Sequence, residues 1–289
     1  MDHRYDWSSR CRSIGIAVLD YLIVKLDASE CSASVLGRVL GKRTKGIATA
    51  IVLPTLVTFL YFIVFKDHWL QQPAFALKVL QFAFPMMWIA LVLKERWQDC
   101  GIAKLQLVDS ETQSPTASSA SWSQRTSIIF GIVMGFAVSL AMWFIYKSLP
   151  PEALEGLVSE ARKKVREMKF DSLPRFIGLG VFYSLFHSFL EEYYFRWFVF
   201  GQLRRVTSFL PSMLICGLAF MAHHVIILFV YFGNTPLLAI FLSLSIAVGG
   251  MIWAWQYEKS RSLVGPWISH MIVDAGIFFI GYHVLFGAV

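Results

Sequence analysis

Two adjacent glutamates, Glu191 and Glu192, lie inside an otherwise apolar stretch, and Arg196 follows Glu192 by one helical turn. Aromatic and aliphatic residues flank these charges on both sides. A charge at the centre of a membrane helix costs on the order of 2.5–3.5 kcal/mol on insertion scales, so a cluster of charges needs a purpose. We therefore expect an intramembrane site that uses these side chains.

Histidines and an aspartate occur at helical spacing in the same stretch and in two later apolar stretches. The pairs four residues apart are His187 with Glu191, Phe220 with His224, and His270 with Asp274. Residues four apart share one face of a helix. Because polar groups cannot face lipid cheaply, we expect these faces to converge inside a helical bundle.

Such a set supports two kinds of hydrolytic chemistry. A carboxylate near a histidine can deprotonate water, and neighbouring donors can stabilise the oxyanion that forms when this water attacks an amide. Alternatively, the set could bind zinc and leave one position for water. The ligands would then come from Glu191, His224, His270 and Asp274. Neither GxSxG nor HExxH is present in the sequence, which argues against a serine hydrolase and against a zincin.

The composition indicates a polytopic membrane protein. Of 289 residues, 56% are hydrophobic and only 16% are charged, which is too apolar for an ordinary soluble domain. The net charge of +7 is typical of basic cytoplasmic loops that contact anionic lipid, and we expect the lipid bilayer and no nucleic acid as a partner. The 4 cysteines form no CxxC pair and indicate no zinc ribbon or disulfide framework.

Apolar runs of about 20 residues, long enough to cross a bilayer, predict an all-α bundle of seven to eight spans. The predicted spans are 47–65, 74–93, 128–146, 175–200, 209–232, 235–255 and 262–286. The weakly apolar run Ile14–Leu26 would add an eighth, although we interpret it as an interfacial helix. Apolar residues at helical spacing, with charges on the other face, predict one amphipathic surface helix in the segment 147–173.

These features divide the chain into segments with different expected roles. The predicted segments are a cytoplasmic or interfacial part at 1–46, amino-terminal spans at 47–146 with a flexible loop near 100–125, the amphipathic helix at 147–173, and a catalytic membrane core at 174–289. The excess of Lys and Arg before the first span predicts a cytoplasmic amino terminus. The basic segment 147–175 then falls on the outer side, against this rule.

The three motifs, in order on successive membrane helices, resemble those of the CPBP family. They read Glu191-Glu192-x-x-x-Arg196, Phe220-x-x-x-His224 and His270-x-x-x-Asp274. This family comprises the type II CAAX prenyl proteases and the bacterial bacteriocin-processing or self-immunity proteins. The resemblance covers roughly 174–286, and residues 1–170 carry no motif of the family.

The resemblance implies an intramembrane endopeptidase that acts on a membrane-associated protein or peptide, with a CAAX-like, lipidated or C-terminal cleavage site. Glu191 would activate water with His224 as its partner, while His270 and Asp274 would bind the substrate carbonyl and stabilise the oxyanion. The third motif commonly ends in Asn, so Asp274 is a departure that modestly favours metal binding. The family has been described both as metal-dependent and as metal-free, so the cofactor is either none or zinc.

The same resemblance implies supporting roles and a location. Glu192 and Arg196 would form an ion pair that orients the site, and His187 and Phe220 are candidates for a supporting layer around it. The protein would be a multi-pass protein of the cell membrane in a bacterium, or of the endoplasmic reticulum in a eukaryote. Two rival functions remain at this point: a non-enzymatic peptide-binding immunity or scaffold protein, and an ion-coupled transporter.

Overall fold

The computed structural model describes residues 37–65, 71–94 and 121–287, and every regular element in these ranges is helical. Seven helices among them are long and apolar enough to cross a membrane. They are Gly37–Val64, Ala76–Leu93, Gln124–Lys147, Leu173–Leu203, Phe209–Phe232, Pro236–Ser260 and Val264–Phe286. Each overlaps one predicted span, so the predicted all-α bundle is confirmed. The run Ile14–Leu26 and nearly all of the loop predicted near 100–125 lie outside the described residues.

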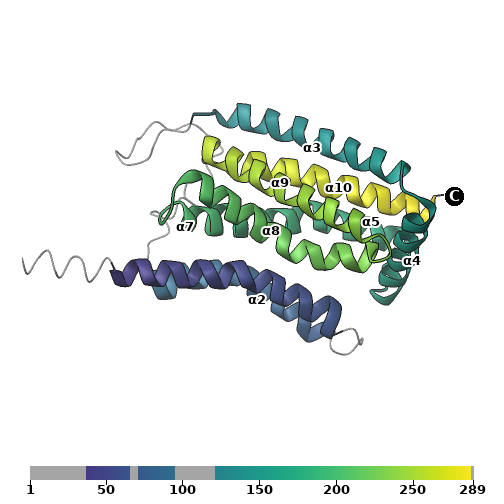
Figure 1. The fold of residues 1–289 in the computed structure, drawn as a ribbon, viewed down its shortest axis with the longest axis horizontal. Helices are drawn as coiled ribbons and strands as arrows, with labels where there is room; N and C mark the ends of the chain where they lie inside the picture. The colour runs from purple at the N-terminus through teal and green to yellow at the C-terminus, as the bar shows by residue number, and fades with distance from the viewer. Residues whose placement is uncertain (1–36, 66–70, 95–120, 288–289) are drawn as a thin grey trace, which may run out of the picture. The chain divides into compact units, whose positions relative to one another are not determined.

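The chain divides by its internal contacts into two units, Met1–Lys45 and Gly46–Val289. Of the first unit the structure describes only residues 37–45, which are helical. The second unit contains the helices that are labelled in Figure 1, and the whole of the candidate site lies within it.

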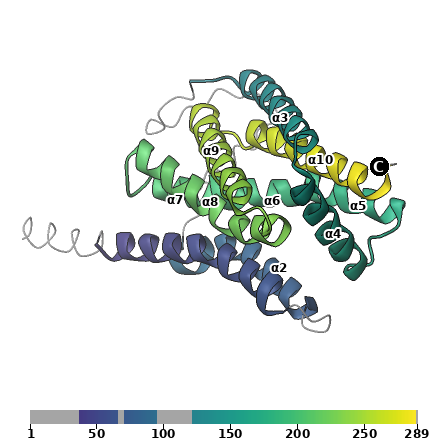
Figure 2. The same cartoon turned by 45° about the vertical axis from the view of Figure 1, so that its right-hand side comes forward.

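Two long helix pairs form much of the second unit. The most extensive contacts join α3 (Gln124–Lys147) to α10 (Val264–Phe286), and α8 (Phe209–Phe232) to α9 (Pro236–Ser260). In Figures 1 and 2, α3 follows α10 along much of its length, and α8 and α9 form a hairpin beside them. Small residues allow this close approach, since a Cβ on Gly131 of α3 would overlap the carbonyl oxygen of Gly265 in α10.

Replacing Gly131 with alanine is expected to destabilise the α3–α10 contact by about 1–3 kcal/mol, because a methyl group forced into a closely packed interface displaces backbone. The matched control is Gly249→Ala in α9, where an added Cβ would meet nothing within 4 Å. Thermal unfolding of the detergent-purified variants measures the difference. An unchanged midpoint for Gly131→Ala would contradict the described packing.

The amphipathic helix predicted between the third and fourth spans is present as α4, Pro151–Glu167. Proline at its first turn fits a helix start, because the missing N–H has no helical acceptor there. Lys164 lies over the rings of Tyr61 and Phe62, 5.2 Å from each centroid. Burial lowers the pKa of this ammonium, and Glu167, 3.8 Å away, opposes that shift.

The fourth span, Leu173–Leu203, alternates between α-helical and π-helical turns. Its parts are α5 (Leu173–Phe182), η5 (Tyr183–His187), α6 (Ser188–Glu192), η6 (Tyr193–Phe200) and α7 (Gly201–Leu203), where η denotes a π-helical segment. All residues from Tyr194 to Phe200 are buried, so neighbouring helices surround this part of the span on every side. Wide π-helical turns occur often at functional sites, and here they flank the two glutamates directly.

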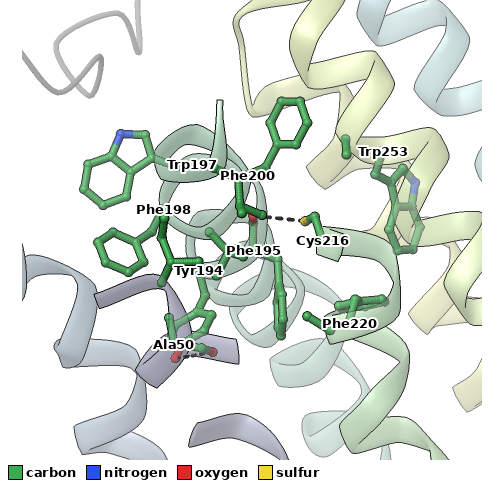
Figure 3. Packing of buried hydrophobic residues seen from close by; sticks show 14 of the residues in the cluster. Ala50, Tyr194, Phe195, Trp197, Phe198, Phe200, Cys216, Phe220 and Trp253 are labelled. Atoms are coloured by element: carbon green, nitrogen blue, oxygen red, sulfur yellow. Dashed lines mark hydrogen bonds between the residues drawn. The ribbon is translucent and has the colours of Figure 1, made fainter. Parts of the chain in front are cut away.

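An aromatic core surrounds η6, as Figure 3 shows. Its largest members are Tyr194, Phe195, Trp197, Phe198, Phe200, Phe220 and Trp253. The Tyr194 hydroxyl donates to the carbonyl of Ala50 at 3.0 Å, and the buried thiol of Cys216 lies 3.3 Å from the carbonyl of Phe195. The aromatic side chains beside the glutamates therefore pack in the protein interior, and this packing holds the fourth span against the first span and α8.

Candidate active site

Glu191 lies at the point where three membrane helices converge. Its Oε1 is 3.3 Å from Nε2 of His223 in α8 and 3.8 Å from Nε2 of His187 in its own span. Its Oε2 is 3.6 Å from Nε2 of His270 in α10. Only 5% of Glu191 is exposed. The two carboxylate oxygens thus face different partners, one directed to His223 and the other to His270.

The imidazole of His270 bridges both glutamates. Its Nδ1 lies 2.8 Å from Oε1 of Glu192, so this nitrogen carries a proton and donates it to the carboxylate. Its Nε2 lies 3.6 Å from Oδ1 of Asp274, one turn later in α10. The ring stacks on Trp253, with centroids 4.4 Å apart. These contacts fix the plane of the ring and aim Nε2 at the space between Glu191 and Asp274.

Glu192 and Arg196 form the ion pair that the resemblance implies, with Oε2 and Nε 3.1 Å apart and both side chains fully buried. Its geometry is that of a charge contact, because within the described residues no guanidinium nitrogen of Arg196 has an aligned hydrogen-bond acceptor. The guanidinium lies over the rings of Phe220, at 4.5 Å, and Trp253, at 5.0 Å. Charge and cation–π contact therefore hold Arg196 in place behind the site.

His224 lies beside this centre and donates its Nδ1–H to the carbonyl of Phe220, 2.8 Å away. In the neutral ring this leaves Nε2 as a free acceptor. Phe220 lies in ring contact with several of the candidate imidazoles. Its centroid is 5.6 Å from His223, 4.7 Å from His224 and 5.7 Å from His270. Phe220 thus spaces the imidazoles of α8 and α10, as a residue of a supporting layer does.

The structure also places His223 in the site, which the helical spacing of the three motifs did not indicate. His223 is 5% exposed, stacks on Phe195 at 5.5 Å, and makes the closest contact that a histidine makes with Glu191. Its Nδ1 is buried without a hydrogen-bond partner among the described residues. A signal was available in the sequence, because both members of a histidine pair within an apolar helix need polar partners.

The predicted residues differ in how far they reach the surface. Glu192 is completely buried, whereas the side chains of His187 and Asp274 each keep 15% of their surface exposed. His187 also lies in ring contact with Tyr183 at 4.7 Å and with Phe82 of the second span at 5.9 Å. His187, Asp274 and His224 are therefore all partly exposed, whereas Glu192 is enclosed by its neighbours.

The site contains side chains that could bind a metal, although they are not the full ligand set predicted from the sequence. Ligand atoms of Glu191, His223 and His224 lie within 4.8 Å of one another. One carboxylate and two imidazoles form a donor set of catalytic zinc sites, and the buried, unpartnered Nδ1 of His223 is consistent with a missing ligand. Bound zinc would polarise a carbonyl and lower the pKa of a bound water. His270 and Asp274, which were also predicted as ligands, are not in this group.

The comparisons with known proteins agree with this geometry. Residues 173–276 match the family model described as type II CAAX prenyl endopeptidase Rce1-like. The matched residues include all three motifs. Comparison with curated proteins and with solved structures found no match. Residues 173–276 form an Rce1-like type II CAAX prenyl endopeptidase domain, so this part of the chain is a membrane protease domain, in agreement with the resemblance of its motifs to the CPBP family.

Proposed function

We propose that the protein hydrolyses a peptide bond in a membrane-associated protein or peptide, with Glu191 as the base that activates water. One observation carries this proposal: the two carboxylate oxygens of Glu191 have different surroundings. His223 bonds to Oε1 at 3.3 Å, while Oε2 has no short hydrogen bond among the described residues and faces His270 at 3.6 Å. A general base needs such a free oxygen directed at the place where the reacting water lies.

The reacting water fits between Glu191, His270 and Asp274. Nε2 of His270 lies 3.6 Å from Oε2 of Glu191 and 3.6 Å from Oδ1 of Asp274, just beyond direct hydrogen bonding. An oxygen atom about 2.8 Å from each of two such atoms completes a triangle with good hydrogen-bond lengths.

Hydrolysis then proceeds by transfer of one proton. Glu191 takes a proton from the water, whose oxygen attacks the carbonyl carbon, and the carbonyl oxygen becomes an oxyanion. A protonated His270 donates from Nε2 to this oxyanion, while Glu192 holds the ring through Nδ1 and Arg196 balances the charge of Glu192. Glu191 returns the proton to the amide nitrogen, the C–N bond breaks, and a carboxylic acid and an amine leave.

Asp274 provides a test of how the oxyanion is stabilised. In the proposed mechanism Asp274 is protonated and donates to the oxyanion, as an amide of the same shape also does, whereas leucine has no donor. We therefore expect Asp274→Asn to keep or raise kcat/KM, and Asp274→Leu to lower it by about 10²–10³-fold. Rates on one reconstituted peptide substrate measure both. An asparagine variant as inactive as the leucine variant would show that the carboxylate itself is required.

The proposal is tested by a cleavage assay with the purified, reconstituted protein on membrane-tethered peptides with and without a lipid group. Mass spectrometry identifies the products, and a parallel series contains a zinc chelator. Cleavage at one peptide bond that persists with chelator supports the glutamate-activated water. Cleavage that stops with chelator and returns with zinc would show that a metal held by Glu191, His223 and His224 activates the water.

The charge pattern supports a cytoplasmic location for the basic ends of the fourth span and α9. Glu258 at the end of α9 accepts from Arg204 at 3.0 Å and from Arg261 at 3.1 Å. Trp122, before the start of α3, donates its N–H to the carbonyl of Lys259 at 3.1 Å, so these basic helix ends share one side of the bundle. Lys and Arg concentrate on the cytoplasmic side of membrane proteins, and the amino terminus is proposed to lie there too.

A further inference from the structure

Trp253 is a buried aromatic residue on α9, a helix that carries none of the three motifs. Its ring stacks on the imidazole of His270, with the centroids 4.4 Å apart and the two planes at 17°. The same ring lies 5.9 Å from the ring of Phe220 in α8, and both side chains are drawn in Figure 3. Through Trp253, α9 therefore contacts a residue of the candidate active site.

A hydrogen bond anchors the indole of Trp253 to α10. The indole Nε1–H donates to Oγ of Ser269 at 3.0 Å, and Ser269 is fully buried. Ser269 directly precedes His270, so the residue that anchors the indole is the chain neighbour of the residue on which the indole stacks. A buried indole N–H needs an acceptor, and Ser269 supplies it. The hydrogen bond and the stacking together hold the indole in one orientation against α10.

Trp253 also connects the two partners of Glu192. Glu192 accepts from Nδ1 of His270 at 2.8 Å and lies 3.1 Å from Nε of Arg196. The guanidinium of Arg196 lies 5.0 Å from the centroid of the Trp253 ring. The imidazole of His270 is therefore held at Nδ1 by a carboxylate and on its face by an indole. A ring rotation that moved Nε2 would disturb both contacts.

We propose that Trp253 and Ser269 are positioning residues of the protease: their hydrogen bond fixes the indole, and the indole keeps Nε2 of His270 directed at the substrate carbonyl. This inference rests on the proposed function, in which His270 donates from Nε2 to the oxyanion. Reacting groups must be held within a small tolerance, and a neighbouring side chain locked by packing and hydrogen bonding provides this. Loss of the anchor should therefore lower kcat and leave KM nearly unchanged.

Two variants of equal shape isolate the hydrogen bond, because Ser269→Thr keeps the hydroxyl acceptor and Ser269→Val replaces it with a methyl group. On one reconstituted peptide, we expect kcat per folded molecule to be about tenfold lower in Ser269→Val than in Ser269→Thr, with KM values within about twofold. The matched control is Trp255→Phe, which alters the cluster with Trp122 and Phe130 and should keep the native kcat. Equal kcat values in the two Ser269 variants would overturn the proposal.

A second set of variants covers the case in which the added methyl groups disturb α10. Trp253→Phe keeps an aromatic ring but removes the N–H donor, and Ser269→Ala removes the acceptor. Both break the same bond, so the double variant should be no slower than the slower single variant. Losses in kcat that multiply in the double variant would show that the two residues act independently, against the proposal.

A measurement without substrate separates this proposal from the proposed reaction. In protein labelled with nitrogen-15 at histidine, solvent exchange of the Nδ1 proton that His270 donates to Glu192 reports how firmly the ring is held. Its signal is assigned by its loss in His270→Phe. We expect exchange at least about tenfold faster in Ser269→Val than in Ser269→Thr. Equal exchange rates would overturn the positioning role even if peptides are cleaved. The expected difference without any cleavage by the native protein would reject the hydrolytic function alone.

Discussion

Replacing Glu191 with glutamine is expected to lower kcat for peptide cleavage by about 10²–10⁴-fold, the usual contribution of a general base. The amide keeps the size of the carboxylate and can still bond to His223, so the bundle should stay folded. It cannot accept a proton from water, and the reaction loses its base. Single-turnover cleavage of a reconstituted peptide measures the effect, with thermal unfolding as the check on folding.

The matched control for this substitution is Glu155→Gln, an exposed glutamate on α4. It removes the same charge from a position away from the site and should leave the rate within about twofold, as expected for surface substitutions. Native-like cleavage by Glu191→Gln would remove the proposed mechanism. A cellular phenotype that survives in Glu191→Gln would favour a peptide-binding immunity or scaffold protein, and ion flux in proteoliposomes would favour a transporter.

Replacing His270 with phenylalanine is expected to lower kcat by about 10²–10³-fold, which is the typical cost of losing one oxyanion donor. The phenyl ring preserves the stacking on Trp253 but removes both Nδ1, which bonds to Glu192, and Nε2, which faces Glu191. KM should change much less than kcat, because the lost interaction forms mainly in the transition state. Steady-state kinetics in one detergent or vesicle system separates the two parameters.

A second histidine on α10 provides the control for this variant. His283 lies at the far end of the helix, where Nδ1 is 2.7 Å from the hydroxyl of Tyr146. His283→Phe removes an imidazole from the same helix without touching the site, so it should alter stability but not the rate of the folded fraction. If both variants reduced kcat alike, disruption of α10 rather than loss of a donor would explain the effect of His270→Phe.

Much of the fold could be predicted from the sequence because membrane spans follow from hydropathy and length. All seven long apolar helices overlap predicted runs, and α4 is present where amphipathic spacing indicated it. The glutamates and histidines of the three motifs were recognisable for the same reason, since charge within an apolar helix is rare and has few explanations. The fourth span departs most from a simple helix, and its π-helical turns, like those at the ends of the first and second spans, leave no signal in hydropathy.

The details of the site that the sequence missed depend on tertiary contacts. Regular helical spacing puts His223 on a different face from His224, yet both faces of α8 are interior at this level and His223 makes the closer contact with Glu191. Phe82 lies within a predicted span, but only the structure shows that it packs against His187 of the fourth span. Spacing along one helix cannot tell which helices are neighbours.

The central claim is that water, activated by Glu191, attacks the substrate carbonyl directly. The most direct measurement is a single turnover with excess enzyme in water labelled with oxygen-18, followed by mass spectrometry of the product and of the enzyme peptide that contains Glu191. The account predicts that each new carboxyl group carries one oxygen-18 atom and that Glu191 stays unlabelled. Unlabelled product, or label in the Glu191 carboxylate, would show that Glu191 attacks the carbonyl itself and would contradict the account.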